Sequence, residues 1–182
     1  SEEEKLLTEL KKLNDDLERR VRKSLDEIRR YNEKMREDVR RSDREVREEK
    51  KRLDEKLKKD GTDDDELRRV KKKLEDYLRR NEEEVRKSRE EVRRYLTKNR
   101  EDVRRSKEEL RKLLEKVKKD GLPEEALKKV RELVERHKRT VDEALEKSER
   151  LLREHERTVD EVLDRSRRAV EEVKKTLDDA RK

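Results

Sequence analysis

Two histidines, His137 and His155, are the residues of this sequence with the clearest capacity for chemistry. They are 18 residues apart, which on a helix is about 27 Å, so they cannot bind one metal ion together. Neither belongs to a helical metalloprotease motif, because the run His155-Glu156-Arg157-Thr158 lacks a second histidine. The chain has no cysteine to supply thiolate ligands. We therefore expect no metal site and no cofactor.

A serine close to a histidine is the other arrangement that could do chemistry. Antiparallel helices that turn at Gly121 bring together positions equidistant from that glycine, which places Ser106 near His137 and Ser88 near His155. A nucleophilic serine also needs an acidic residue that orients the histidine, donors for the oxyanion and a substrate cleft. The sequence indicates none of these within a closed helical core. We therefore predict no catalytic residue and no enzymatic activity.

Sensing of pH is the remaining chemical role for His137 and His155. Burial disfavours the charged imidazolium and so lowers the pKa of a histidine below its unfolded value. Stability would then fall on acidification, because the unfolded chain takes up the proton first. A pH-responsive bundle is therefore one hypothesis for what the histidines do.

Helices are the elements that must position these side chains. Of the 182 residues, 62% are charged and 26% are hydrophobic, whereas ordinary globular domains are about 25% charged and about 45–50% apolar. That composition alone is typical of disorder. However, the chain has only 2 glycines and 1 proline. Abundant Glu, Lys, Arg and Leu with so few helix breakers indicates long helices.

The charge pattern and the lack of long apolar runs argue against two classes of partner, nucleic acids and membranes. The formal net charge is +7, but acidic and basic residues alternate throughout, as in the run from Arg40 to Glu45. The only aromatic residues are 3 tyrosines, so both a basic face and base-stacking platforms for nucleic acid are missing. No apolar run approaches the roughly 18 residues of a membrane span, and no signal peptide opens the chain. We expect a soluble protein that binds neither nucleic acid nor membrane.

Two breaker segments divide the chain into near-equal thirds. The first, 58–63, contains Gly61 and a Thr62 cap; the second, 118–125, contains Gly121 and places Pro123 at a first helical position. Residues 1–4 resemble a capping box. We predict helices over about 2–60, 63–120 and 123–181. Such short connections force neighbouring helices antiparallel, so residues 1–182 should form a single all-α domain, a long up-down-up three-helix bundle.

Each predicted helix carries one apolar stripe at spacings of three and four residues. In the first helix the stripe runs from Leu6 to Leu57 and lacks one apolar position near Glu49 and Lys50. The stripes repeat every 18 residues: Tyr77 and Asn81, for example, recur as Tyr95 and Asn99. Eighteen residues make five turns at about 3.6 residues per turn, so we expect little supercoiling.

Polar residues interrupt these stripes at matching heights. Positions about equally far from the two glycines fall into four layers of two alternating types. Two layers contain a histidine: Asn32 with Ser88 and His155, and Asn14 with Ser106 and His137. The other two contain a tyrosine: Ser42, Asn81, Tyr77 and Ser166, and Ser24, Asn99, Tyr95 and Ser148. Tyr31 lies on the same stripe. A buried polar group without a partner costs roughly 1–3 kcal/mol, so we predict interhelical hydrogen-bond networks that specify register and pairing. In the alternative interpretation, some of these groups point to solvent at the edge of the stripe. Thr140 and Thr158, one turn after each histidine, could bond their own helix backbone.

The 18-residue repeat, the Asp-Gly loops and the Ser/Asn/His/Tyr core positions together resemble those of de novo designed helical bundles with buried hydrogen-bond networks. The resemblance covers the whole chain. It implies a robust scaffold with no inherited enzyme, and a synthetic chain of unknown localisation that would be expressed in a bacterial cytoplasm.

A row of leucines beside the stripes leaves two interpretations open. Leu78, Leu96 and Leu114 flank the stripe of the second helix, and Leu133 and Leu151 flank that of the third. They could widen the core seam, or form a groove for a fourth helix from another copy or a separate peptide. We therefore favour a structural scaffold that requires no partner, with a binding module or self-association as the alternative.

Overall fold

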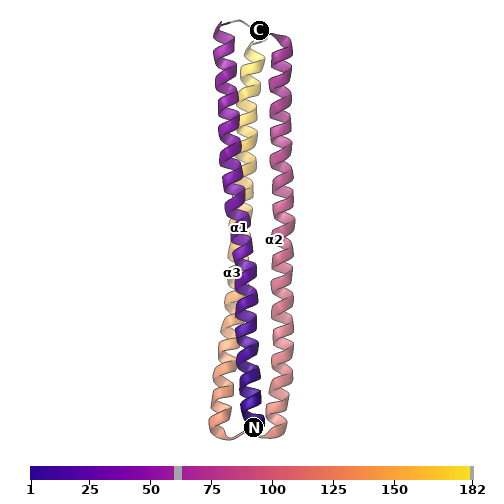
Figure 1. Ribbon diagram of the computed structural model, residues 1–182, viewed down its shortest axis with the longest axis vertical. Coiled ribbons are helices and arrows are strands. Elements are labelled where there is room, and N and C mark those ends of the chain that lie inside the picture. The colour runs from indigo at the N-terminus through magenta and orange to yellow at the C-terminus, as the bar shows by residue number, and fades with distance from the viewer. Residues whose placement is uncertain (60–62, 181–182) are drawn as a thin grey trace. The chain divides into compact units, whose positions relative to one another are not determined.

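The computed structural model describes residues 1–59 and 63–180, and these form three long helices: α1 (Glu2–Lys59), α2 (Asp64–Asp120) and α3 (Glu124–Ala180) (Figure 1). The described residues contain no strand. The predicted all-α three-helix fold is therefore confirmed. Thr62 and the turn at Gly61 lie outside the described residues.

Polar side chains start the first two helices. The Glu4 backbone N–H donates to Ser1 Oγ at 3.3 Å, which is the first half of a capping box. In place of the second hydrogen bond, the Ser1 ammonium forms an ion pair with Glu4 Oε2 at 3.9 Å. For α2 the capping residue is Asp63, whose Oδ1 accepts the Asp65 N–H at 3.1 Å. Each cap satisfies a backbone donor that the first turn of a helix leaves free.

Gly121 ends α2 in the left-handed conformation, with φ of 62°. Its N–H donates to the Val117 carbonyl at 3.2 Å, which is the αL form of helix termination. The Pro123 carbonyl then accepts the Leu127 N–H at 2.9 Å. The sequence predicts Pro123 as the first helical residue. Because α3 begins at Glu124, Pro123 lies one position before the helix.

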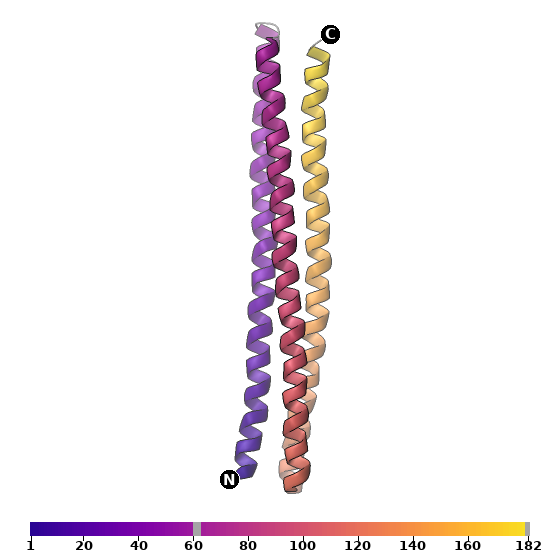
Figure 2. The same cartoon turned by 90° about the vertical axis from the view of Figure 1, so that its right-hand side faces the viewer.

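The chain divides into two compact units. The first unit comprises Ser1–Arg29 and Glu91–Arg153, and the second comprises Arg30–Glu90 and Glu154–Lys182. Segments of α1, α2 and α3 lie side by side in each unit, with α2 antiparallel to the other two (Figures 1 and 2). Each unit therefore contains its own three-helix core.

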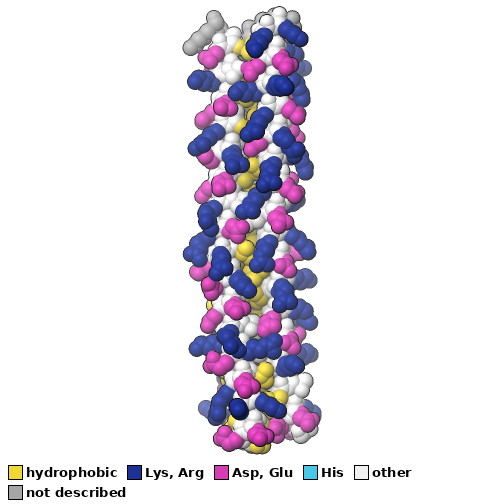
Figure 3. All heavy atoms as spheres, turned by 90° about the vertical axis from the view of Figure 1, so that its left-hand side faces the viewer, with side chains coloured by type: hydrophobic (Ala, Val, Ile, Leu, Met, Phe, Trp, Pro, Cys, Tyr) yellow, Lys and Arg dark blue, Asp and Glu magenta, His cyan; other side chains and the backbone are white. Residues whose placement is uncertain are grey.

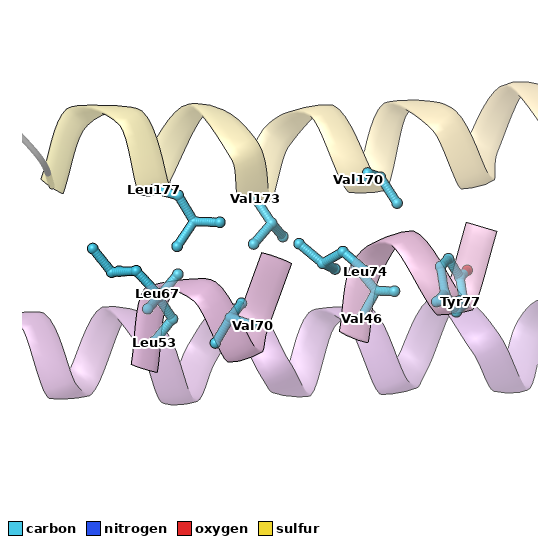
Figure 4. Packing of buried hydrophobic residues seen from close by; sticks show 9 residues of the cluster. All are labelled: Val46, Leu53, Leu67, Val70, Leu74, Tyr77, Val170, Val173 and Leu177. Atoms are coloured by element: carbon cyan, nitrogen blue, oxygen red, sulfur yellow. The ribbon is translucent and has the colours of Figure 1, made fainter. Parts of the chain in front are cut away.

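The apolar stripes form these cores because each turns one face of its helix inward. In the second unit Val46 and Leu53 of α1 pack with Leu74 of α2 and Val173 of α3 (Figure 4). The corresponding cluster of the first unit is built around Leu6, Leu10, Val117 and Val130.

On the face drawn in Figure 3, acidic and basic side chains intermingle, and hydrophobic side chains show only in a narrow row along the seam between the helices. Among the described residues, the only large hydrophobic side chain classed as exposed is Leu145, at 40%. Most of the apolar side chains are therefore withdrawn from water, which is the main source of stability for helices this polar.

Candidate functional site

A chain of hydrogen bonds links all three helices in the second unit. Ser42 Oγ of α1 donates to Asn81 Oδ1 of α2 at 3.2 Å, and Asn81 Nδ2 donates to Ser166 Oγ of α3 at 2.9 Å. Asn81 and Ser166 are buried. The asparagine amide suits this central place because it offers both an acceptor and donors.

Tyr77 belongs to the same layer. Its hydroxyl donates to Asp43 Oδ1 at 3.4 Å and also interacts with Asn81 and Ser166. Burial raises the pKa of the Tyr77 phenol, and the nearby Asp43 carboxylate raises it further. The phenol therefore stays protonated and remains a donor at neutral pH.

His155 and Ser88 form the second polar layer of this unit. The Ser88 Oγ and His155 Nε2 atoms make a hydrogen bond of 2.8 Å, and His155 is 0% exposed. Burial lowers the pKa of His155; Arg89 adds to this effect, whereas Glu156 opposes it. The His155 Nδ1 atom has no hydrogen-bond partner among the described residues.

The first unit contains the equivalent pair, Ser106 and His137. Ser106 Oγ lies 2.7 Å from His137 Nε2, and His137 is 2% exposed. Burial lowers the pKa of His137, and Lys107 lowers it further. Asn14, expected near Ser106, donates instead from Nδ2 to the Leu133 backbone carbonyl at 3.1 Å, and no hydrogen bond joins it to Ser106 among the described residues.

Asn99 and Ser148 form the other polar layer of the first unit. Asn99 Nδ2 donates to Ser148 Oγ at 3.4 Å, and Ser148 Oγ donates to the Ala144 carbonyl at 2.6 Å. Ser24 is buried as well, but the structure records no hydrogen bond from it to Asn99, whose Oδ1 lacks a partner in the described part of the chain. This layer therefore lacks the side-chain bond from α1 that Ser42 supplies in the second unit.

The remaining polar positions are placed differently. Asn32 is buried, yet its Oδ1 has no partner among residues 1–59 and 63–180. Tyr31 and Tyr95 are half-buried, and the Arg94 guanidinium lies 5.5 Å from the Tyr95 ring centroid.

Thr140 and Thr158 bond their own helix. Each donates from Oγ1 to the carbonyl four residues earlier, Thr140 to Arg136 at 2.9 Å and Thr158 to Glu154 at 3.0 Å. Thr140 Oγ1 also lies 3.2 Å from Glu18 Oε1 of α1. These threonines are thus tied mainly to the α3 backbone.

Sequence reasoning did not single out Asp102. This α2 residue is 7% exposed, and its Oδ2 is buried without a hydrogen-bond partner in the described regions. Little in the sequence indicates that Asp102 is buried. It adjoins the stripe residue Val103 but carries a charge, and the equivalent residue 18 positions earlier, Glu84, is exposed. A buried carboxylate oxygen without a donor costs stability.

The geometry limits what these residues can do chemically. Within the described ranges no group of three or more His, Cys, Asp or Glu residues is placed to hold a metal ion. No helix there is long and apolar enough to cross a membrane. Both Ser–His pairs lie inside helical cores, so the arrangement supports hydrogen bonding and proton uptake on opening.

The comparisons with known proteins identify the fold. The chain is similar to a solved structure described as a "Computationally designed three helix bundle", with a TM-score of 0.55 and 18% sequence identity over 99% of this chain and 90% of that chain. No protein-family model and no curated protein sequence matches. The chain thus has the fold of a designed three-helix bundle, and its core contains the buried Ser, Asn, His and Tyr hydrogen bonds that the sequence resemblance implied.

Proposed function

We propose that the chain is a designed structural scaffold without catalytic activity, whose buried polar side chains specify which helix faces which. The observation that carries this proposal is the hydrogen-bond chain from Ser42 through Asn81 to Ser166. A purely apolar seam tolerates sliding, because one leucine replaces another at little cost, whereas a buried amide loses its partners when the register changes.

The two Ser–His pairs add to this specification. They repeat the same contact once in each unit, at 2.7 Å and 2.8 Å. A shift of α3 by four residues against α2 would put a valine or a leucine opposite each serine and leave both imidazoles unpaired. Such unpaired groups penalise the alternative packing.

The experiment compares the protein with a variant in which the three residues of the Ser42–Asn81–Ser166 chain are apolar and Tyr77 keeps its bond to Asp43, Ser42→Ala/Asn81→Leu/Ser166→Ala. We expect this variant to remain helical and equally stable or more so, because replacing a whole network can be neutral or stabilising. Its amide NMR spectrum should show extra or broadened peaks from more than one packing. A single sharp set of peaks from the variant would contradict the proposed role.

The flanking leucines support a scaffold that needs no partner helix. Leu96 and Leu151 are buried, and Leu78, Leu114 and Leu133 pack against the apolar clusters of their own units. Light scattering after gel filtration tests this point: we expect a monomer of 22.5 kDa. A defined oligomer would favour the binding module instead.

A pH-responsive bundle is the second candidate function, and the burial of both Ser-bonded histidines favours it. Each histidine has a pKa lowered mainly by burial. Acid would therefore promote opening of the cores that hold the neutral imidazoles. The pH dependence of unfolding, described in the Discussion, tests this candidate.

A further inference from the structure

A groove in the second unit lies where the apolar stripe of α1 is interrupted. It runs along the seam between α1 and α2, has a volume of about 580 Å³, and has Val46, Leu74 and Tyr77 as its apolar lining. Figure 4 shows these three side chains along that seam. The stripe should present an apolar side chain at Glu49, but here a carboxylate borders the groove.

The repeat shows which kind of side chain is missing. Eighteen residues before Glu49 the sequence has Tyr31, and 18 residues before Tyr31 it has Leu13. Glu49 is thus the only one of the three equivalent positions without an apolar or aromatic group. The Glu49 carboxylate lies 3.8 Å from Lys73 Nζ and 3.5 Å from an Arg52 guanidinium nitrogen, so two cations hold its charged end.

We propose that this groove binds a small, uncharged aromatic molecule whose ring takes the place that Tyr31 occupies in the preceding repeat. The Tyr77 ring and the two aliphatic side chains offer a surface for an aromatic face, and aromatic ligands prefer such apolar pockets with a few polar groups at the rim.

The rim argues for a neutral ligand. It carries four acidic and four basic side chains, so it has no net charge that would select a cation or an anion. Val46, Leu74 and Tyr77 are 2–4% exposed, and long charged side chains such as Glu49 and Lys73 lie over them. These side chains are flexible and can move aside when a ring enters.

The probe is p-cresol, which is the side chain of tyrosine as a free molecule. We expect p-cresol to cause saturable NMR shifts in the methyl groups of Val46 and Leu74. The variant Glu49→Tyr, which supplies the ring covalently, should weaken binding at least roughly tenfold, because the space is filled. Glu49→Gln should retain binding, since it removes the charge and keeps the space.

Glu55→Tyr is the matched control, because Glu55 is exposed on the same helix and outside the groove. It should bind p-cresol as the parent chain does. Three results would overturn the proposal: shifts that never saturate, binding that survives in Glu49→Tyr, or loss of binding in Glu49→Gln. Benzylamine and p-toluenesulfonate, the cationic and anionic analogues, should bind more weakly than p-cresol, and tighter binding of either would overturn the choice of an uncharged ligand.

Discussion

His155 lies wholly within the second unit, with its Nε2 2.8 Å from Ser88 Oγ. An imidazole in this position is held neutral by its surroundings. The residues facing it include Arg89, whose guanidinium lies 3.5 Å from the Glu156 carboxylate. His137 has Lys107 nearby instead. The charges around both histidines therefore fail to compensate for burial, and the pKa of each stays below its ordinary value.

We predict that acid destabilises the protein through these histidines. Because the folded pKa is lower than the unfolded value of about 6.5, the unfolded chain binds more protons between the two values. The contribution of the neutral histidines to the free energy of unfolding is fully present above about pH 6.5, and it falls as the pH drops from there toward the folded pKa. Guanidinium unfolding midpoints at about pH 7.5 and about pH 5 should show the loss.

The variant His137→Asn/His155→Asn separates this effect from the titration of surface carboxylates. It should lose less stability than the parent chain over the same pH range. Equal losses in the two proteins would show that the histidines do not contribute.

We predict that Asn81→Ala destabilises the chain by about 1–3 kcal/mol, since it deprives Ser42 and Ser166 of their shared partner. Urea unfolding followed by circular dichroism measures the change. The control is Asn32→Ala, whose Oδ1 already lacks a hydrogen-bond partner among the described residues and whose loss should therefore cost less. A larger effect at Asn32 than at Asn81 would contradict the importance of the three-helix chain.

We predict that Asp102→Leu stabilises the protein by roughly 1 kcal/mol or more, because it removes a buried carboxylate oxygen that has no donor. The repeat supplies the control. Glu84 precedes Asp102 by 18 residues and is exposed, so Glu84→Leu should change the free energy of unfolding by less than about 0.5 kcal/mol. Thermal and urea unfolding of the two variants would settle the comparison, and a destabilising Asp102→Leu would show that the carboxylate has a partner in solution.

We predict that Gly121→Ala costs about 1–2 kcal/mol, because its φ of 62° is unfavourable for a residue with a Cβ atom. No neighbouring atom lies within 4 Å of an added Cβ, so the cost is one of backbone conformation alone. Gly121→Asn should cost less, since asparagine tolerates this conformation. Urea midpoints measure both, and equal costs would point to a cause other than backbone conformation.

The sequence allowed the helices and several side-chain contacts to be predicted from spacing. Equidistance from Gly121 brings Ser106 to His137 and Ser88 to His155, and equidistance from Gly61 in the sequence brings Ser42 to Asn81. These predictions need only the rise of a helix and short loops. They depend on no detail of side-chain conformation, which is why they could be made.

Finer contacts could not be predicted in this way. Asn14 donates to the backbone carbonyl of Leu133. The spacing of polar side chains in the sequence does not show which backbone carbonyls can accept a hydrogen bond. Ser24 and Ser42 are equivalent in the repeat, yet only Ser42 bonds an asparagine. Such contacts depend on side-chain rotamers and on the local helix spacing, and the residue types alone determine neither. The burial of Asp102 was missed because charged residues are seldom placed inside.

The 18-residue period has one further consequence. Five whole turns return the inward face to its starting angle, as happens between Asn81 and Asn99 or between Ser148 and Ser166. One period could therefore be spliced into or out of every helix without rotating any inward-facing side chain. The helices could therefore be lengthened or shortened in steps of about 27 Å.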